Sequence, residues 1–279
     1  MTWRFTADLD AYRAATWSYL VAEPERYSVF LTVLAGLDRI GTGAYGEQLP
    51  VLGWWPASGP VRAAILQTPP RPMLITTLPG NSAAELAAAL AGQGTALSGV
   101  NGTDQDAGAI AEAWLDRTGV GGRIVQRQRL YRLSDLIWPK PRPAGSARIA
   151  GARDLEAVRE LYSAFATETG QDGAPGIAED RLAAGQLMLW EDAGEPVALA
   201  GGSEIIEGVA RVGPVYTPPD LRGRGYGGAV TAAVSELARS RGAESVILFT
   251  DLANPTSNAL YARLGYRPVE DRVVLLFGG

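Results

Sequence analysis

The sequence predicts an α+β protein with a mixed sheet in each of two tandem domains of the same topology. Two observations lead to this prediction. The order of helical and strand-like hydrophobic patterns in the first half of the chain recurs in the second half. Between the halves lies the segment Trp138-Pro-Lys-Pro-Arg-Pro-Ala-Gly-Ser146, whose alternating prolines favour an extended connector. We therefore expect one domain over residues 1–140 and a second over residues 147–279.

The hydrophobic period and the flanking residues justify each element of the first half in turn. A period near that of an α-helix predicts helices at residues 8–22, 25–40, 81–91 and 104–118. Asn81 or Ser82 is the expected N-cap of the third of these helices. Short apolar or alternating runs predict strands at residues 51–55, 61–68, 73–78, 96–100 and 123–133. The first three strands form the pattern of a meander.

The second half gives the same order of elements. Helical periods are found at residues 154–168, 178–184, 225–241 and 257–263. Strand patterns are found at residues 187–191, 197–206, 209–216, 245–250 and 269–277. Two helices therefore precede a three-stranded meander in each half, and a helix, a strand, another helix and a last strand follow it.

The composition excludes several kinds of function. The chain has 279 residues, 47% hydrophobic and 20% charged, which is typical of a globular protein. It contains no cysteine and no histidine, which excludes disulfides, thiolate or imidazole nucleophiles and the common zinc sites, and we expect no metal. The net charge of −5 argues against nucleic-acid binding. No leader and no membrane-spanning apolar run is seen, so we expect a cytoplasmic monomer or homodimer that binds no membrane.

The most informative segment is the turn Arg222-Gly-Arg-Gly-Tyr-Gly227, which joins a predicted strand to a predicted helix. Gly223, Gly225 and Gly227 allow successive backbone N–H groups to point inward without a Cβ in the way. The N-terminus of the helix adds a favourable field for an anion, and Arg222 and Arg224 add positive charge. The segment therefore predicts a phosphate-binding turn.

Two other kinds of phosphate-binding turn are excluded. A P-loop requires Gly-Lys-Ser or Gly-Lys-Thr, but the single lysine, Lys140, lies in the proline-rich connector. A dinucleotide-binding fold places its glycine-rich turn after the first strand of a parallel sheet. The turn in this sequence follows a meander instead.

A second segment, one helix and one strand downstream, contains Asn254, Tyr261 and the run Leu264-Gly-Tyr-Arg267. Together with the pattern Arg222-x-x-Gly225-x-Gly227, it resembles the GNAT superfamily of acyl-CoA-dependent N-acyltransferases. The resemblance covers about residues 147–279. It implies acetyl-CoA as the cofactor and two tandem GNAT-like domains, each a central, mostly antiparallel sheet flanked by helices.

The resemblance also implies a role for individual residues. The backbone amides from Arg222 to Gly227 would hold the diphosphate of coenzyme A, and the strand around Val215 would pair with the pantetheine arm. Asn254 would bind a pantetheine amide, and Tyr261 would protonate the departing thiolate. On the residues alone, Asn254 could instead be a turn residue and Tyr261 a core tyrosine. The implied cofactor-binding residues are Val215, Tyr216, Thr217, Arg222, Gly223, Arg224, Gly225, Tyr226, Gly227, Asn254, Asn258 and Tyr261.

The first half lacks the phosphate-binding turn. The corresponding segment, Leu78-Pro-Gly-Asn-Ser-Ala-Ala-Glu85, has one glycine and no arginine. We therefore expect a degenerate N-terminal domain that binds no coenzyme A and completes the acceptor pocket. One cofactor site per chain follows.

The residue that takes the proton from an attacking amine is less evident. Without histidine, the base must be a carboxylate, a tyrosine or a chain of water molecules. Many members of the superfamily use a glutamate on the fourth strand, but Arg211 stands near that position. Glu204 and Glu207, expected in the turn before this strand, are the candidate catalytic carboxylates, and Asp251 is a third choice. Arg211 could instead bind a carboxylate of the acceptor, which would favour amino-acid-like substrates.

Aromatic residues are the other candidates for the acceptor pocket. Trp54 and Trp55 lie on opposite faces of a predicted strand, so at most one of them can line a pocket. Trp190 and Tyr216 are further candidates, with core packing as the alternative for each. The segment 169–176 contains three glycines and suits either a mobile lid or a linker.

The sequence thus predicts an enzyme that transfers an acetyl group from coenzyme A to a primary amine of a small molecule. Transfer would be direct, in a ternary complex, because no cysteine is available to carry the acyl group. A peptide or protein amine is a further acceptor to consider. The alternative is a non-catalytic acyl-CoA-binding sensor or interaction protein, which Arg211 favours and which the presence of Asn254 and Tyr261 disfavours. A thioesterase is a weaker third alternative.

Overall fold

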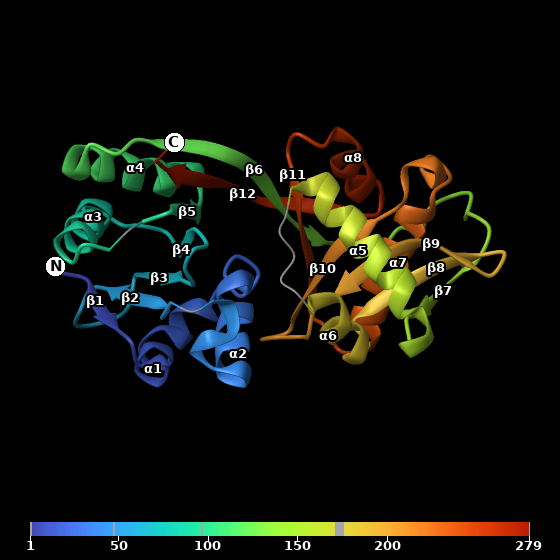
Figure 1. Cartoon of the computed structure of the whole chain (residues 1–279), viewed down its shortest axis with the longest axis horizontal. Coiled ribbons are helices and arrows are strands. Elements are labelled where there is room, and N and C mark those ends of the chain that lie inside the picture. The colour runs from blue at the N-terminus through green and yellow to red at the C-terminus, as the bar shows by residue number, and fades with distance from the viewer. Residues whose placement is uncertain (1, 47, 96, 171–175, 279) are drawn as a thin grey trace. The chain divides into compact units, whose positions relative to one another are not determined.

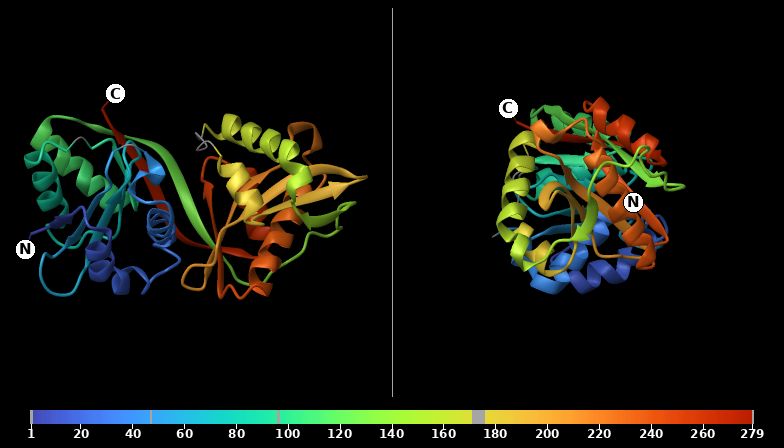
Figure 2. Two further views of the ribbon diagram at one scale, coloured as in Figure 1. Left: turned by 60° about the horizontal axis from the view of Figure 1, so that its bottom comes forward. Right: turned by 90° about the vertical axis from the view of Figure 1, so that its right-hand side faces the viewer.

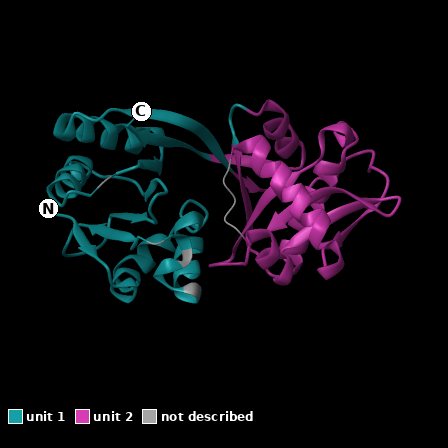
Figure 3. Ribbon diagram, in the orientation of Figure 1, with its two compact units in different colours: residues 1–130, 251–253, 270–279 teal, residues 131–250, 254–269 magenta. Residues whose placement is uncertain are grey.

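The computed structural model describes residues 2–46, 48–95, 97–170 and 176–278, and the chain divides into two compact units (Figure 3). Unit 1 comprises Met1–Leu130, Asp251–Ala253 and Glu270–Gly279, and unit 2 comprises Tyr131–Thr250 and Asn254–Val269. Both units contain a mostly antiparallel sheet flanked by helices, which confirms the predicted fold class (Figure 1). In these described ranges no helix is long and apolar enough to cross a membrane.

Unit 1 is a sheet of short strands with helices packed against it. Strands β1 to β4 pair in order and antiparallel, β4 and β5 pair parallel, and β5 pairs antiparallel with the last strand of the chain, β12. Helices α3 and α4 enclose a core that includes Leu86, Leu90 and Ile110. The elements are β1 (Arg4–Thr6), α1 (Leu9–Leu20), α2 (Ser28–Ile40), the 3₁₀ helix η1 (Thr42–Tyr45), β2 (Val51–Trp55), β3 (Ala63–Gln67), β4 (Met73–Ile75), α3 (Ser82–Gly92), β5 (Gly99–Gly102), α4 (Asp104–Thr118) and the first part of β6 (Gly122–Leu133).

Unit 2 repeats this order. Strands β7 to β10 pair in order and antiparallel, and β10 pairs parallel with β11. The elements are β7 (Ser146–Ile149), the 3₁₀ helix η2 (Ala152–Asp154), α5 (Leu155–Thr169), α6 (Ile177–Ala183), β8 (Leu187–Asp192), β9 (Glu195–Gly202), β10 (Val209–Tyr216), the 3₁₀ helix η3 (Pro219–Leu221), α7 (Tyr226–Ser240), β11 (Ser245–Asp251), α8 (Pro255–Arg263) and β12 (Tyr266–Phe277).

The sheet of unit 2 is covered on both faces. Helix α7 packs on one face, in a core that contains Ala210 and Val212 of β10. Helices α5 and α6 pack on the other face, in a core that contains Tyr216 of the same strand. Because side chains alternate along a strand, Arg211 points away from the α7 core, toward the face that carries α5 and α6.

Two long strands belong to both units. Strand β6 begins in unit 1 and ends in unit 2, whereas β12 begins in unit 2 and ends in unit 1 (Figure 2). In unit 1, Val273 to Leu276 of β12 pair with Gly102 to Gly99 of β5. The predicted contiguous domains, 1–140 and 147–279, differ from this division, because the last ten residues complete the sheet of the first unit.

The proline-rich segment is part of unit 2 instead of a boundary between the units. No helix or strand is found between residues 134 and 145, as expected for an extended segment. Trp138 packs against the α7 core, and the Nε1 of Trp190 donates a hydrogen bond to the carbonyl of Ala144 over 2.7 Å. The segment is therefore held along the surface of one unit.

Candidate functional site

The turn from Arg222 to Gly227 adopts the strained backbone that its glycines permit. Gly223 has φ +77° and Gly225 has φ +86°, both in the left-handed region that side chains disfavour. Gly225 is the N-cap of α7. The glycines singled out in the sequence thus let the chain reverse from β10 into α7 within a few residues.

The start of α7 presents unpaired donors. The first N–H groups of a helix have no acceptor within it, and a glycine N-cap offers no side chain to satisfy them. A Cβ on Gly227 would lie 3.1 Å from the Oγ1 of Thr217, so a side chain there would crowd the end of β10. Nothing lies within 4 Å of the position a Cβ would take on Gly223. This open set of amides at a positive helix end fits a phosphate group.

Arg222 connects the turn to its surroundings. Its Nε donates to the carbonyl of Thr217 over 2.9 Å, and its Nη2 donates to the Glu168 carboxylate over 2.5 Å. Its guanidinium lies 5.7 Å from the ring centre of Tyr216, and Glu168 raises the pKa of Arg222. Because both ion-pair partners are nearly half exposed, the pair contributes at most about 1 kcal/mol to stability. The arginine remains available to a stronger anion.

Two further residues of the same turn, Tyr226 and Arg224, also form hydrogen bonds with the surrounding protein. The buried Tyr226 packs in the α7 core and donates its hydroxyl proton to the Asp192 carboxylate over 2.5 Å, and this carboxylate raises the pKa of Tyr226. The exposed Arg224 donates to the carbonyl of Asp220 over 3.2 Å. Tyr226 is therefore a support of the turn, while the Arg224 cation is open to solvent.

Strand β10 leaves one edge open next to this turn. Its parallel pairing with β11 runs from Val209 with Ser245 to Val212 with Leu248. Between Val212 and Val215 its pairing with β9 shifts register, and Val215 then pairs with Ala200 of β9. The other edge of Val215, facing β11, has no pairing among the described strands. An extended ligand can add to that edge as a further strand.

Asn254 and Asn258 hold the start of α8. Asn254 is the N-cap, and its Oδ1 accepts a hydrogen bond from the N–H of Ser257 over 3.0 Å. Asn258 accepts the hydroxyl proton of Tyr131 over 3.0 Å and donates its Nδ2 to the carbonyl of Asn254 over 2.7 Å. The side-chain nitrogen of Asn254 is the donor that this arrangement leaves for a ligand.

Tyr261 is a core residue, which was one of the two alternatives that the sequence left open for it. It is buried in the α7 core, and its ring meets that of Tyr266 edge-on at 6.0 Å. Burial raises the pKa of Tyr261 to about 12. Within the described ranges no hydrogen bond to its hydroxyl is formed, so the side chain is a neutral phenol with an unused proton.

The structure keeps the candidate carboxylates apart from the turn. Glu204 and Glu207 are exposed between β9 and β10, and β10 extends for eight residues, roughly 25 Å, from this point to the turn at Arg222. Asp251 accepts a hydrogen bond from the N–H of Ala253 over 2.7 Å and thus caps the following turn.

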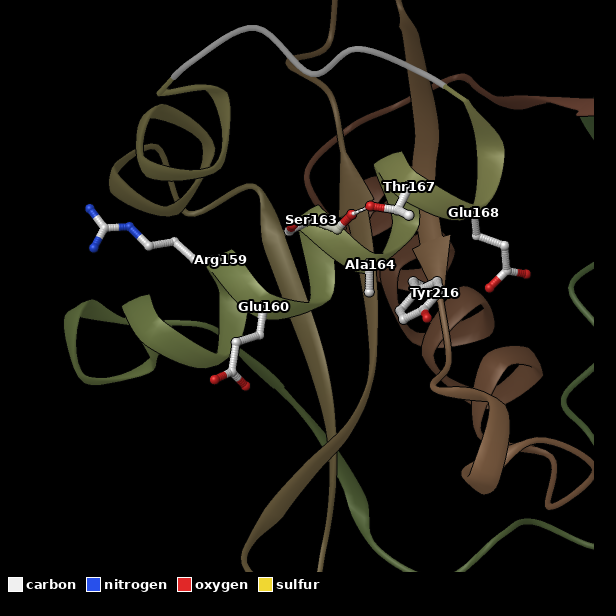
Figure 4. A pocket seen from close by; sticks show the side chains of 7 residues that line it. All are labelled: Arg159, Glu160, Ser163, Ala164, Thr167, Glu168 and Tyr216. Atoms are coloured by element: carbon white, nitrogen blue, oxygen red, sulfur yellow. Dashed lines mark hydrogen bonds between the residues drawn. The ribbon is translucent and has the colours of Figure 1, made fainter.

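A groove follows α5 beside the turn (Figure 4). Its volume is about 690 Å³, within the range of small-molecule sites. Glu168 lies at the edge of the groove and accepts a hydrogen bond from Arg222 of the phosphate-binding turn. The groove is therefore adjacent to this turn. No pattern in the sequence predicted this groove, because only the packing of α5 over β10 creates it. Its lining residues are Arg159, Glu160, Ser163, Ala164, Thr167, Glu168 and Tyr216.

The other aromatic candidates are packed in cores. Trp55 lies in the core of α3 and α4, whereas Trp54 meets the ring of Tyr12 at 6.3 Å, so the two do occupy opposite faces of β2. Trp190 is buried in the α7 core. Of the four aromatic candidates, Tyr216 lines the groove. The expected lid falls largely on residues 171–175, outside the described residues.

In unit 1 the side chain of a single arginine bonds to both of the parallel strands, β4 and β5. Arg272, a buried residue of β12, donates its Nη2 to the carbonyls of Ile75 on β4 and Asn101 on β5, over 3.3 and 3.2 Å. Its Nη1 donates to Glu270 over 3.0 Å. At the start of α3, Trp55 donates to Glu85 over 2.8 Å. An anion at the start of α3 would therefore meet a carboxylate.

Comparisons with known proteins find matches to the second unit. A family model described as "Acetyltransferase (GNAT) family" matches residues 155–266. A mycothiol acetyltransferase from Kineococcus radiotolerans is 33% identical over 139 residues, which is 45% of this chain and 44% of that protein. The matched segment thus spans less than half the length of that relative.

Solved structures extend the likeness to the whole chain. A GNAT-family acetyltransferase from Colwellia psychrerythraea has a TM-score of 0.63 at 12% identity, with 100% of both chains covered. A GCN5-related N-acetyltransferase from Sphaerobacter thermophilus has a TM-score of 0.59 at 19% identity, with 98% of this chain and 94% of that chain covered. At these identities the likeness concerns the fold, and it includes both units.

Proposed function

Because residues 155–266 match a model of the GNAT family of acetyltransferases, we propose that this chain transfers an acetyl group from acetyl-CoA to the primary amine of a small molecule. The observation that carries the proposal is the row of unpaired amides at the start of α7, framed by Gly223 and Gly225. The relative named for acetylation of mycothiol supports a small-molecule acceptor. No general base is assigned by this proposal.

The site fits coenzyme A in three places. The amides between Arg222 and Gly227 would hold the diphosphate, with Arg224 as an additional cation. The open edge of β10 at Val215 would pair with the amides of pantetheine. The Nδ2 of Asn254 would donate to a pantetheine carbonyl. Bound acetyl-CoA supplies the activated acyl carbon and a thiolate leaving group.

The amine nitrogen forms a bond to the acyl carbon, the carbon–sulfur bond breaks, and the sulfur departs with the electron pair. Tyr261 donates its unused proton toward that sulfur. Complete transfer from a phenol of pKa about 12 to a thiolate near 8.5 costs roughly 5 kcal/mol. Tyr261 therefore acts first by a hydrogen bond to the developing thiolate, and the sulfur takes the proton as it leaves.

The amine must lose one proton before or during attack. Glu204 and Glu207 lie at the end of β10 remote from the turn, and this step is assigned to neither of them. An acceptor with a low amine pKa reduces the demand on the base. An α-amine of pKa near 8 is far more often neutral at pH 7.4 than a lysine side chain of pKa near 10.4.

A binding experiment and a turnover experiment test the proposal together. Acetyl-CoA is titrated calorimetrically into the wild type and into the double variant Arg222→Glu, Gly225→Asp, which adds two negative charges to the turn. We expect one site per chain in the wild type and no binding in the variant. Thiol release is then followed with a panel of amines. Neither binding nor thiol release in the wild type would contradict the proposal.

The second candidate is an acyl-CoA-binding protein without catalysis. Arg211, which stands near the position where many members of the superfamily use a glutamate, favours it. Binding of acetyl-CoA at one site, lost in the double variant, without thiol release for any amine would support this candidate over the enzyme.

A further inference from the structure

Arg181, on α6, holds an unusual position for a cation. Its Nη1 donates to the carbonyl of Gly213 over 2.5 Å, at the point where β10 shifts register. A guanidinium has five N–H donors, and one carbonyl accepts only one of them. Across the described part of the chain, Arg181 forms no ion pair with a carboxylate. Its charge is half-buried and has no counter-ion there.

The neighbouring residues pack closely against the Nη1 side of this guanidinium. A Cβ on Gly201 of β9 would lie 2.7 Å from the carbonyl oxygen of Gly213 and 2.8 Å from the Nη1 of Arg181, so only glycine fits beside this hydrogen bond. The hydroxyl of Tyr162, on α5, is buried and has no hydrogen-bond partner among the described residues. Arg181 lowers the pKa of Tyr162, although burial raises it by more. A second polar group thus lies beside the cation with an unused hydrogen-bonding position.

Arg211 adds charge to the same face. It precedes Gly213 by two residues on β10, so their Cα atoms are roughly 7 Å apart. It points away from the α7 core, toward α5 and α6. Of the two acidic residues next to Arg181 along α6, Glu179 pairs with Arg159 over 2.7 Å and Asp180 is exposed.

We propose that Arg181, with Arg211 on the same face of β10, binds a carboxylate of the acceptor, so that the acceptors are amino-acid-like amines. This inference rests on the proposed function and names its substrate class. The planar fork of a guanidinium matches a carboxylate in two parallel hydrogen bonds, and Tyr162 can donate a third.

The location suits this role. Gly213 lies two residues before Val215, whose open edge would hold the pantetheine arm, so an anchor at Gly213 brings the acceptor to the acyl end. A positive charge close to an ammonium group also lowers its pKa. The two arginines would therefore help the amine to lose its proton.

The test uses the whole chain with acetyl-CoA and matched pairs of acceptors, namely the common α-amino acids and their α-amides. We expect thiol release with at least one acid and a KM for the corresponding amide about 10- to 100-fold higher. In the variant Arg181→Gln, which keeps a donor for Gly213, the KM for the acid rises by the same factor. The KM for the amide and the Kd of acetyl-CoA stay unchanged.

Two further variants complete the test. Arg181→Lys keeps the charge without the fork and should fall between the wild type and Arg181→Gln. Arg153→Gln removes an equivalent charge from a side chain that is 76% exposed and should match the wild type.

Several results would overturn the inference. Equal use of acids and amides by the wild type would do so, as would an equal loss for both in Arg181→Gln, which would assign Arg181 to holding Gly213 in place. Thiol release with other amines but with no acid would also overturn it while leaving the proposed function standing. If acetyl-CoA does not bind at all, the proposed function fails instead.

Discussion

The hydroxyl of Tyr226, the first residue of α7, donates a hydrogen bond to the carboxylate of Asp192 at the end of β8. This hydrogen bond therefore attaches the turn that carries the phosphate-binding amides to the hairpin of β8 and β9. The bond joins two side chains whose residues are 34 positions apart, and neither side chain belongs to the backbone amides that would hold the phosphate. It converts a glycine-rich, intrinsically flexible turn into a fixed arrangement of donors.

Removal of this anchor should weaken cofactor binding without removing any cofactor contact. We expect Asp192→Asn to raise the Kd of acetyl-CoA about 3- to 10-fold, because an amide accepts a weaker hydrogen bond than a carboxylate. Calorimetric titration measures the change. The matched control is Glu195→Gln, at the start of β9, which should leave the Kd unchanged. An unchanged Kd in Asp192→Asn would show that the turn is rigid without this bond.

Tyr261→Phe should lower kcat about 10- to 100-fold and leave the Kd of acetyl-CoA within a factor of two. The ring remains to fill the core, and the hydroxyl forms no hydrogen bond within the described residues whose loss would destabilise α8. Stopped-time thiol assays and calorimetry give the two quantities. A kcat equal to that of the wild type would assign proton donation to another group.

The raised pKa of Tyr261 also predicts a pH dependence of stability. A group whose folded pKa, about 12, exceeds its unfolded value near 10 stabilises the folded state fully below pH 10, and this contribution is lost as the pH rises toward 12. The loss amounts to about 3 kcal/mol. Denaturant unfolding at pH 8 and pH 11 should therefore show a smaller decrease for Tyr261→Phe than for the wild type. Equal decreases would mean that the phenol is better solvated than its burial indicates.

Arg272 in unit 1 gives a prediction about the number of sites. Arg272→Ala should lower the free energy of unfolding by about 2–4 kcal/mol, because Glu270 loses a buried partner and two carbonyls lose a donor. We expect the stoichiometry of acetyl-CoA to stay at one per chain, since the start of α3 still carries Glu85. Chemical unfolding and calorimetry test the two statements. Appearance of a second site would show that Arg272 alone closes unit 1.

The sequence predicted best those elements whose ends are defined locally. Helix α4 has the predicted bounds 104–118, because Thr103 caps its start by accepting the N–H of Asp106 and Gly119 ends it at φ +74°. Strand β10 also has its predicted bounds, 209–216. Strands β1 and β7 were missed because three or four residues are too few to show a period.

The phosphate-binding turn was predictable for a similar reason. Its proposed function depends on backbone amides, and the positive φ at positions 223 and 225 favours glycine. These glycines can be recognised in the sequence without knowledge of the fold. Arg181 carried no such signal. Arg181 is a single arginine in a short helix, and its contact with the carbonyl of Gly213, 32 residues away, exists only in the folded chain.

The sequence by itself determined the order of helices and strands, the repeat of that order and the position of the phosphate-binding turn, because each depends on residues that are close together along the chain. Tertiary structure alone decided the rest. Strand β12 completes the sheet of the first unit, the groove forms where α5 lies over Tyr216, and Tyr226 meets Asp192. Strand pairing and burial depend on which distant surfaces come together, and no local period or cap specifies that choice.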